Sequence, residues 1–267
     1  MTGRAKMLSV MVLTEDSGAG AYDTVQALVK EMLKLLVRGV QTHRIGFTPL
    51  ENESARRAMH ANLWKSDNPR DERDIRLLIR SIINELLKPN GFVLYHLDAD
   101  CPWSEQTASE AGHEASANVR EFHSRMCPPI EAGLRQELLK RSHDEKEPEK
   151  RMKRFRLLVP FYSIEAWLYQ NTREARRLCE EGGCGQCPTK LTEWEKDRAS
   201  LDDVIKPKEA LCFQDKYNAH LASSGFPDRE VFDADASFTR SVEGLLECDE
   251  LTGALERTFA LPEQPAP

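Results

Sequence analysis

A short apolar run that ends in two acidic residues constrains the fold of this 267-residue chain more than any other stretch. Residues 92–97 are aromatic, aliphatic and β-branched, and Asp98-Ala99-Asp100 follows them directly. Because polar and apolar residues do not alternate in this run, it predicts a strand that is buried on both faces, as in a parallel sheet. Ligands of open α/β sheets bind at the carboxyl ends of the strands, which is where the two aspartates would lie.

Two other apolar runs predict neighbouring strands of the same sheet. Residues 7–13 form one run, and Glu15 follows it in a loop that contains glycine. Residues 155–162 form the other, and Glu165 follows it in the first turn of an expected helix. We expect the three runs to lie side by side in one sheet, so that Glu15 meets the two aspartates at one edge.

The segments between these strands predict an α/β fold with a mostly parallel sheet flanked by helices. Apolar residues at helical spacing predict helices over residues 24–37 (capped by Asp23-Thr24), 75–87, 119–126 and 129–140, with Pro128-Pro129 separating the last two. Residues 40–47 are expected to add a strand, residues 48–74 a loop-rich excursion and residues 143–149 an unstructured charged connector. We divide the chain into a core, 1–170, and a mainly helical C-terminal region, 171–267, packed on it.

Charge and hydropathy limit the classes of protein to which the chain can belong. The net charge of −7 gives no overall attraction to nucleic acid, so any such binding needs a local basic patch. No stretch approaches the roughly 20 apolar residues that span a bilayer, and no signal peptide opens the chain. With seven cysteines and no export signal, reduced thiols and a cytoplasmic location are expected, without a membrane partner.

The spacing of Asp98 and Asp100 favours a metal site. Two carboxylates at i and i+2 repel each other unless a cation neutralises them, and oxygen ligands suit Mg²⁺ or Mn²⁺. The alternative is a strand end that runs into a turn with solvated acidic side chains.

A basic cluster precedes the third strand. It holds five cations in seven residues, namely Lys150, Arg151, Lys153, Arg154 and Arg156. The cluster is interpreted either as a solvated edge beside a hydrophobic strand or as a nucleic-acid-binding ridge that contacts phosphates.

Cys184 and Cys187 form a C-x2-C pair among glycines that resembles half of a zinc knuckle. A closed structural zinc site needs four ligands, and Cys179, Cys212 or His220 would have to complete the set. With one paired motif only, a glycine-rich loop with free thiols is the favoured alternative to zinc at Cys179, Cys184 and Cys187.

A Glu after the first strand and a D-x-D after a later one resemble the pattern of the TOPRIM superfamily. The chain looks most like the compact stand-alone TOPRIM-like proteins of bacterial phage-defence loci, which are related to the overcoming-lysogenization-defect nucleases. Further similar stretches are Pro160-x4-Glu165-Ala166-Trp167-Leu168 and the C-terminal series Lys206-Pro207-Lys208, Lys216-Tyr217 and Ser237-Phe238. The chain departs from the family where Asp16, in place of a Gly, follows Glu15.

The resemblance implies a Rossmann-like TOPRIM sheet and Mg²⁺-dependent cleavage of phosphodiesters in DNA, tRNA or another RNA. It implies that Asp98 and Asp100 are the principal metal ligands and that Glu15 is a ligand or general base. Glu165 is a further catalytic candidate, and Lys208 would neutralise charge in the transition state. The implied role is the effector of an anti-phage system under an ABC- or AAA-type ATPase partner, and a homodimer is also considered.

Three alternatives remain beside a nuclease. In haloacid-dehalogenase-like phosphatases the D-x-D usually follows the first strand, and glycosyltransferases give no role to an acidic residue after strand one. The non-enzyme alternative is an inactive interaction or sensor subunit. If Asp98 and Asp100 are ligands, replacing both by Asn is expected to abolish cleavage and to preserve or raise stability, because like-charge repulsion is relieved.

Overall fold

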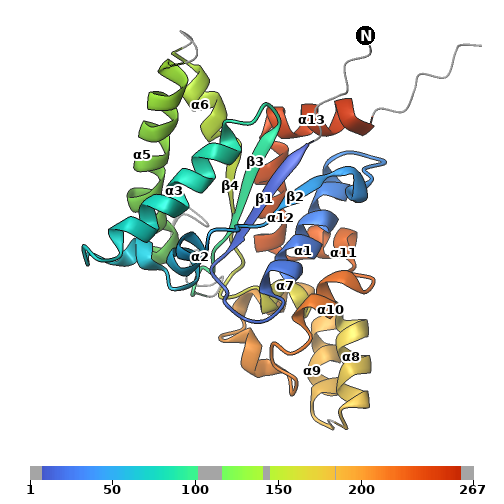
Figure 1. Ribbon diagram of the computed structural model, residues 1–267. Helices are drawn as coiled ribbons and strands as arrows, with labels where there is room; N and C mark the ends of the chain where they lie inside the picture. Colours follow the sequence, from blue (N-terminus) through green and yellow to red (C-terminus); the bar gives the residue numbers. More distant parts are fainter. Residues whose placement is uncertain (1–7, 102–115, 141–144, 184, 260–267) are drawn as a thin grey trace, which may run out of the picture.

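Four parallel strands form one sheet in the order β2-β1-β3-β4 at the centre of the protein (Figure 1). The computed structural model describes residues 8–101, 116–140, 145–183 and 185–259. The strands are β1 (Ser9–Thr14), β2 (Gly46–Thr48), β3 (Gly91–His96) and β4 (Phe155–Leu158). This arrangement confirms the predicted α/β class with a parallel sheet flanked by helices.

The register of the three long runs aligns their carboxyl ends. β1 pairs with β3 along its whole length, from Ser9 opposite Gly91 to Thr14 opposite His96. β4 pairs with the second half of β3, and the ladder continues beyond both strands through the hydrogen bond from Ala99 N to Pro160 O, 3.2 Å. The prediction that these three runs are neighbours is therefore confirmed.

Alternate side chains of the buried strands feed two hydrophobic cores, one on each face of the sheet. Val10 and Val12 of β1 belong to one core, and Met11 and Leu13 belong to the other. The same division separates Phe92 and Leu94 from Val93 and Tyr95 in β3. Because both faces are covered, the strands lack polar alternation, which explains the continuous apolar runs in the sequence.

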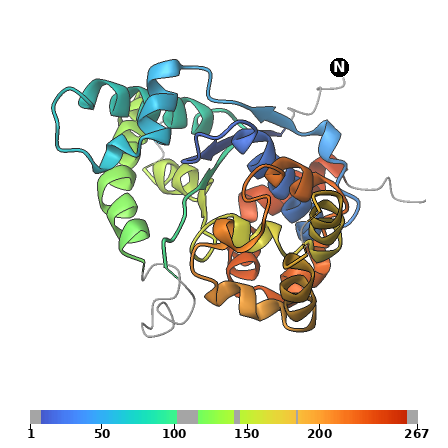
Figure 2. The same cartoon turned by 90° about the horizontal axis from the view of Figure 1, so that it is seen from below.

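Different parts of the chain cover the two faces, as the view from below shows (Figure 2). One face carries α2 (Glu53–His60), α3 (Glu72–Leu86), α5 (Ala117–Leu139) and α6 (Glu147–Met152). The other carries α1 (Ala21–Leu36) and helices of the C-terminal region, which share a continuous core with β1 and β3. The C-terminal helices are α7 (Glu165–Leu168), α8 (Thr172–Glu181), α9 (Cys187–Lys196), α10 (Asn218–Ser223), α11 (Asp228–Ala234), α12 (Ala236–Leu246) and α13 (Asp249–Phe259).

Short 3-10 helices connect several of these elements. They are η1 (Thr42–Arg44), η2 (Leu63–Lys65), η4 (Arg198–Asp203) and η5 (Pro207–Ala210). Within the described residues, no helix is long and apolar enough to cross a membrane.

The prediction that Pro128 and Pro129 separate two helices is wrong, because α5 continues through both. Proline removes a backbone donor and disfavours the helix interior. In α5 this local cost is offset by one buried apolar stripe, which runs the length of the helix at a spacing of three to four residues. The stripe consists of Val119, Phe122, Met126, Ile130, Leu134 and Leu138.

Other boundaries differ from the sequence-based expectation. Residues 48–74 contain the helix α2, whose cap is Asn52: its side chain accepts a hydrogen bond from Ala55 N, 2.9 Å. The expected strand at 40–47 is reduced to η1 and the three-residue β2. α1 begins after Gly20, which has a φ of +85°, and Thr24 donates back to Gly20 O instead of capping. In the expected connector, α6 begins at Glu147, and residues 141–144 lie outside the described residues.

Gly91 has no space for a side chain at the start of β3. A Cβ placed there would lie 1.9 Å from the carbonyl oxygen of Glu85, which is backbone at the end of α3. We expect Gly91→Ala to lower the free energy of unfolding by about 1–3 kcal/mol, measured by urea denaturation. The matched control is Gly244→Ala in α12, where nothing lies within 4 Å of the added carbon. That change should be neutral or stabilising by up to about 1 kcal/mol, and equal effects of the two substitutions would contradict the tight turn at Gly91.

Candidate functional site

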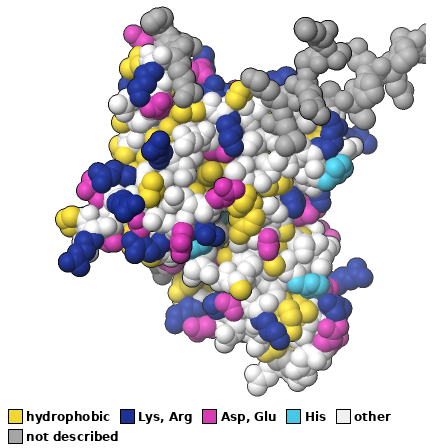
Figure 3. All heavy atoms as spheres, viewed as in Figure 1, with side chains coloured by type: hydrophobic (Ala, Val, Ile, Leu, Met, Phe, Trp, Pro, Cys, Tyr) yellow, Lys and Arg dark blue, Asp and Glu magenta, His cyan; other side chains and the backbone are white. Residues whose placement is uncertain are grey.

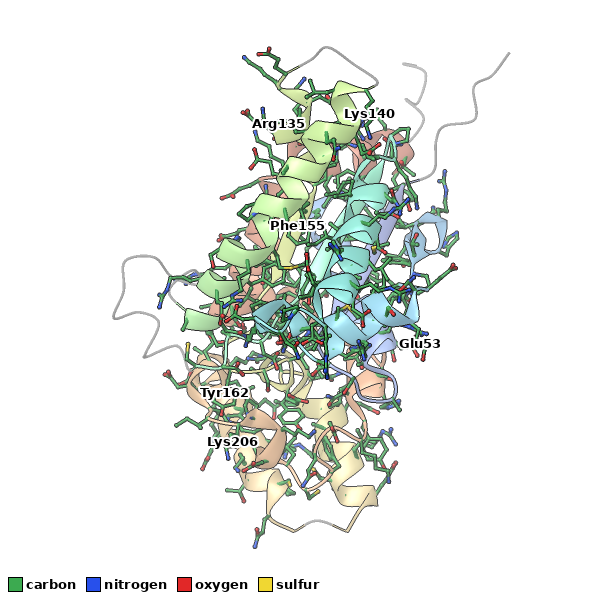
Figure 4. The ribbon with its side chains drawn as sticks, turned by 60° about the vertical axis from the view of Figure 1, so that its left-hand side comes forward. Glu53, Arg135, Lys140, Phe155, Tyr162 and Lys206 are labelled. Atoms are coloured by element: carbon green, nitrogen blue, oxygen red, sulfur yellow. The ribbon has the colours of Figure 1, made fainter. Side chains whose placement is uncertain are left out.

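The carboxyl edge of the sheet opens into a cleft of about 860 Å³. One wall consists of the ends of β1 and β3 with the loop before α1, and it presents Asp16, Asp98 and Asp100. The opposite wall consists of the segment around η5 and the start of α10, and it presents Lys206, Lys208 and Lys216 together with Glu209 and Asp215. Figure 4 shows Tyr162 and Lys206, which line the cleft, in the lower half of the molecule, and Arg135 and Lys140 of α5 near its top.

Glu15 and Asp98 meet directly at this edge. The Oε1 atom of Glu15 accepts a hydrogen bond from the backbone N–H of Asp98, and Oε2 accepts one from the Asn62 side chain, 2.8 Å. Asn62 in turn accepts from the Trp64 indole, 2.9 Å. Desolvation by burial raises the pKa of Glu15, opposed by the nearby charge of His96 and by these hydrogen bonds. The expected convergence of Glu15 with Asp98 is confirmed, and Glu15 supports the backbone from which Asp98 projects.

Asp98 also faces a fully buried histidine, which sequence reasoning missed. His96 Nε2 lies 3.1 Å from Asp98 Oδ1, and His96 Nδ1 lies 3.0 Å from the Thr14 hydroxyl. Burial lowers the pKa of His96, but the hydrogen bond and charge of Asp98, with the charges of Asp16 and Glu15, outweigh it and raise the pKa to about 9. Burial raises the pKa of Asp98 to about 7 against the opposing effect of His96. The His96–Asp98 pair at the end of β3 therefore holds a proton at neutral pH.

Asp100 has a special backbone conformation that aims it into the cleft region. Its φ is +59°, in the left-handed region, which Asp tolerates better than most residues, and its backbone N–H donates to Tyr162 O, 3.1 Å. Tyr162 itself has a φ of +59° and donates back to Cys101 O, 2.9 Å. Paired turns after β3 and β4 thus place Asp100 beside Tyr162 in the lining of the cleft. Burial raises the pKa of Asp100, and Lys65 opposes the shift.

Asn118 fastens the turn that carries the D-x-D pair. Its side-chain amide donates to the carbonyl oxygen of Asp98, 2.5 Å, and the Ser116 hydroxyl donates to Ala99 O, 2.7 Å. Both residues lie at the start of α5. Their roles depend on tertiary contacts, and no motif in the sequence marks them.

Asp16, noted in the sequence only as a departure from the family pattern, is part of the site. Its Oδ2 atom lies 3.9 Å from His96 Nδ1, and its side chain, 39% exposed, lines the cleft. Glu15 does not line the cleft, whereas Asp16 does. The first strand therefore supplies one acidic residue that braces Asp98 and another that faces the cleft.

Glu165 and Lys208, the two further candidates, both line the cleft. The Glu165 carboxylate is buried and accepts hydrogen bonds from Ser163 Oγ, 2.6 Å, and Asn218 Nδ2, 2.8 Å. Lys208 forms an ion pair with Asp215. The hydrogen bond with Asp215 raises the pKa of Lys208, as do the charges of Glu165 and Asp16. A lysine thus faces the acidic wall from the opposite side.

The cleft contains the donor type that oxygen-preferring divalent cations bind. Asp16, Asp98 and Asp100 supply carboxylate oxygens to its lining, which is the ligand chemistry of Mg²⁺ and Mn²⁺. These carboxylates are not gathered into a compact ligand set: among the described residues, only the cysteines bring three candidate ligand atoms within 4.8 Å of one another. The buried Oδ1 atom of Asn218, which also lines the cleft, has no hydrogen-bond partner among the described residues.

The basic cluster of residues 150–156 is not brought to this cleft. It precedes and opens β4, so it lies at the amino ends of the strands, opposite the carboxylates. Arg151 donates to Leu86 O, 3.0 Å, and Lys88 O, 2.6 Å, while Arg154 donates to Pro89 O, 2.8 Å. These arginines satisfy carbonyls at the end of α3. A phosphate-binding role for the cluster stays a prediction.

The cysteines also lie apart from the carboxylates. Cys179 and Cys187 come together, and Cys212, from beyond the paired motif, joins them. Cys184 lies outside the described residues. His220, considered as a completing ligand, instead contacts Glu174 and Arg177.

The contact between Asp98 and His96 changes the stability expected of the two Asn variants. Asp98→Asn leaves the buried imidazolium of His96 facing a neutral amide, so we expect a loss of about 2–4 kcal/mol in metal-free buffer at pH 7. The exposed Asp100, with its positive φ, should tolerate Asn within about 0.5 kcal/mol. Urea unfolding in EDTA checks both values. An Asp98→Asn variant as stable as the wild type would contradict a structural ion pair between Asp98 and His96. It would favour the earlier expectation that removing these charges preserves stability because like-charge repulsion is relieved.

No family model matches the chain, and neither a curated protein nor a solved structure matches it. The resemblance to the TOPRIM superfamily therefore rests on the quoted sequence residues alone.

Proposed function

We propose that this protein is a Mg²⁺- or Mn²⁺-dependent nuclease of the TOPRIM-like type, which hydrolyses phosphodiester bonds at the carboxyl edge of its sheet. One observation carries the proposal: the acidic residues after β1 and β3 meet at one edge, and Asp16, Asp98 and Asp100 face three lysines across a single cleft. Acidic residues that held only strand ends would not need an opposing wall of cations. A phosphate group, in contrast, would contact both walls.

In this proposal Asp98, Asp100 and Asp16 hold the cation. A bound divalent cation would lower the pKa of an attacking water and neutralise charge on the phosphate oxygens. The backbone of Asp98 is held from two sides, by Glu15 at its N–H and by Asn118 at its carbonyl, so its carboxylate enters the cleft in a fixed direction. Such preorganisation is what electrostatic catalysis requires. Glu15 does not line the cleft and acts through the Asp98 backbone, so its role as general base is implied by the resemblance alone.

The lysine wall supplies positive charge on the other side of the substrate. Lys208 is held near the cleft by Asp215, and Lys206 has a φ of +51° that turns the chain at the start of η5. Both side chains are exposed and can reach toward a phosphate. Glu165, buried and doubly hydrogen-bonded, positions Ser163 and Asn218 at the floor of the cleft.

A basic groove beside the cleft offers a path for a nucleic-acid backbone. We call it the α2–α3 groove; its volume is about 690 Å³, and its lining contains four arginines and two acidic side chains, namely Arg56, Arg57, Arg70, Arg73, Glu53 and Asp74. A smaller cavity lined by Arg56, His60 and Asp16 connects this groove with the cleft. Figure 3 shows Lys and Arg side chains gathered at the left edge of the view, over the start of α3. This local patch supplies the electrostatic attraction that the net charge of −7 does not.

The biological role follows from the resemblance alone. We propose that the chain is the effector of an anti-phage system and acts under an ABC- or AAA-type ATPase. An acidic protein with one short basic groove has limited affinity for nucleic acid by itself, which suits an effector that a partner delivers to its substrate. The alternative role, an inactive interaction or sensor subunit, is decided by the activity test below.

Removal of individual carboxylates tests the proposed chemistry. We expect wild-type protein to cleave at least one of plasmid DNA, single-stranded DNA and tRNA in Mg²⁺, with no cleavage in EDTA. Asp98→Asn, Asp100→Asn and Glu15→Gln should each reduce the rate by at least about 100-fold, because the first two remove proposed metal ligands and the third weakens the support of the Asp98 backbone. The matched control is Asp233→Asn on α11, an exposed acid outside the cleft lining, which should retain wild-type activity. Wild-type protein inactive on all three substrates would favour the interaction subunit.

The α2–α3 groove is tested by binding. We expect Arg70→Ala/Arg73→Ala to weaken binding of a single-stranded oligonucleotide and to reduce the slope of log K against log salt by about 2, one unit for each lost phosphate contact. The control is Arg135→Ala/Lys140→Ala, which removes two exposed cations of α5 that do not line the groove and lie near the top of the view in Figure 4. Equal salt slopes in both variants would exclude the groove as the nucleic-acid path.

A further inference from the structure

Three cysteines from separate segments meet in the C-terminal region. Cys179 lies in α8, Cys187 is the first residue of α9, and Cys212 follows η5 in a connecting segment. Their Sγ atoms all lie within 4.8 Å of one another. Chance packing of two neighbouring helices would not bring in a third thiol from 25 residues further along the chain.

The distance between two of the three sulfur atoms matches that of a tetrahedral thiolate site. A Zn–S bond of about 2.3 Å and a tetrahedral angle place two sulfur ligands about 3.8 Å apart. The Sγ atoms of Cys212 and Cys179 are 3.7 Å apart. This separation is also far beyond the ~2.05 Å of a disulfide bond. The backbone N–H of Cys212 donates to Cys187 Sγ, 3.3 Å, a contact that stabilises a charged sulfur ligand.

The surroundings of the three cysteines are compatible with the thiolate form once a cation is present. Cys187 is the first residue of α9, so it lies at the positive end of the helix dipole. Cys179 and Cys187 are buried, whereas Cys212 is exposed and leaves an entry path for an ion. A metal that binds these cysteines would displace the thiol protons into solvent.

We propose that Cys179, Cys187 and Cys212 bind one Zn²⁺ ion in a structural site separate from the acidic cleft. Soft thiolates select zinc over Mg²⁺ or Mn²⁺, whose ligands are oxygen atoms. As the ion binds, each coordinating S–H group loses its proton to solvent and forms a Zn–S bond, with no change of oxidation state. The three thiolates fill three of the four tetrahedral positions, and a water molecule fills the fourth.

The proposed zinc ion would stabilise the segment that forms the lysine wall of the cleft. Cys212 ends the stretch that carries Lys206 and Lys208, and the ion would tie this stretch to the ends of α8 and α9. Two further contacts support the same junction: Lys190 donates to Ala210 O, 3.1 Å, and the Phe213 ring packs edge-to-face on Tyr169. The inference does not depend on nuclease activity, because a structural ion would hold this stretch in either proposed role.

The test measures metal content on the full chain, purified with reductant and without a metal-affinity tag. We expect about one equivalent of zinc by mass spectrometry and a zinc K-edge spectrum dominated by sulfur at about 2.3 Å. Cys179→Ser and Cys212→Ser should each retain less than a tenth of an equivalent. The control Cys127→Ser, a half-buried thiol on α5, should retain the full amount.

Thermal melting of the wild-type protein provides a second readout, which can be used even if a cysteine variant folds poorly. Zinc added back to chelator-treated wild-type protein at about 100 times its Kd should raise the Tm by about 5–10 °C. Less than a tenth of an equivalent in wild-type protein, together with no Tm shift on zinc addition, would overturn the proposal. Full zinc content in Cys212→Ser would overturn it as well, as would a zinc-free protein with a Cys179–Cys212 disulfide by mass spectrometry.

Discussion

The hydrogen bond from the Asp98 backbone to the Glu15 carboxylate is the contact on which the candidate site depends. It exists because β1 and β3 pair in parallel and in register to their last residues, Thr14 and His96. A shift of the register by one residue would turn Asp98 to the other face of the sheet. The apolar residues that bury both faces of β1 and β3 therefore determine the site indirectly, since they set this register.

Bringing Glu15, Asp98 and Asp100 together at the carboxyl edge of the sheet costs free energy, and neighbouring groups offset part of that cost. Burial raises the pKa of Glu15, Asp98 and Asp100, so the ionised forms of these side chains cost free energy that neighbouring groups must offset. His96 compensates part of the charge from within the sheet. Perturbed acidic groups in a cleft are typical of functional sites, because structural residues seldom retain such a penalty. A divalent cation is the species that would compensate the rest.

The parts of this account that the sequence predicted follow from local patterns. Continuous apolar runs predicted the buried strands, and Glu15 and Asp98 were expected to converge because parallel strands share a carboxyl edge. Asp16 appeared only as a departure from a pattern, although its position after the same strand placed it beside the same edge. His96 was hidden inside an apolar run, and only the fold shows that it faces Asp98.

The remaining features depend on tertiary contacts that no local pattern encodes. α5 passes through Pro128 and Pro129 because a long apolar stripe outweighs the local penalty. The third cysteine lies 25 residues beyond Cys187, and packing of the η5 segment on α8 and α9 brings it there. The basic cluster at residues 150–156 looked suited to phosphate, yet two of its arginines bind carbonyls at the far end of the sheet.

The most direct test of the central claim is a crystal structure of the protein soaked in Mn²⁺, with anomalous diffraction to locate the ion. The account predicts an anomalous peak in the cleft, about 2.0–2.2 Å from carboxylate oxygens of Asp98 and Asp100, with Asp16 on the same side. The absence of any peak in the cleft at saturating Mn²⁺, with Asp98 still paired to His96, would contradict it.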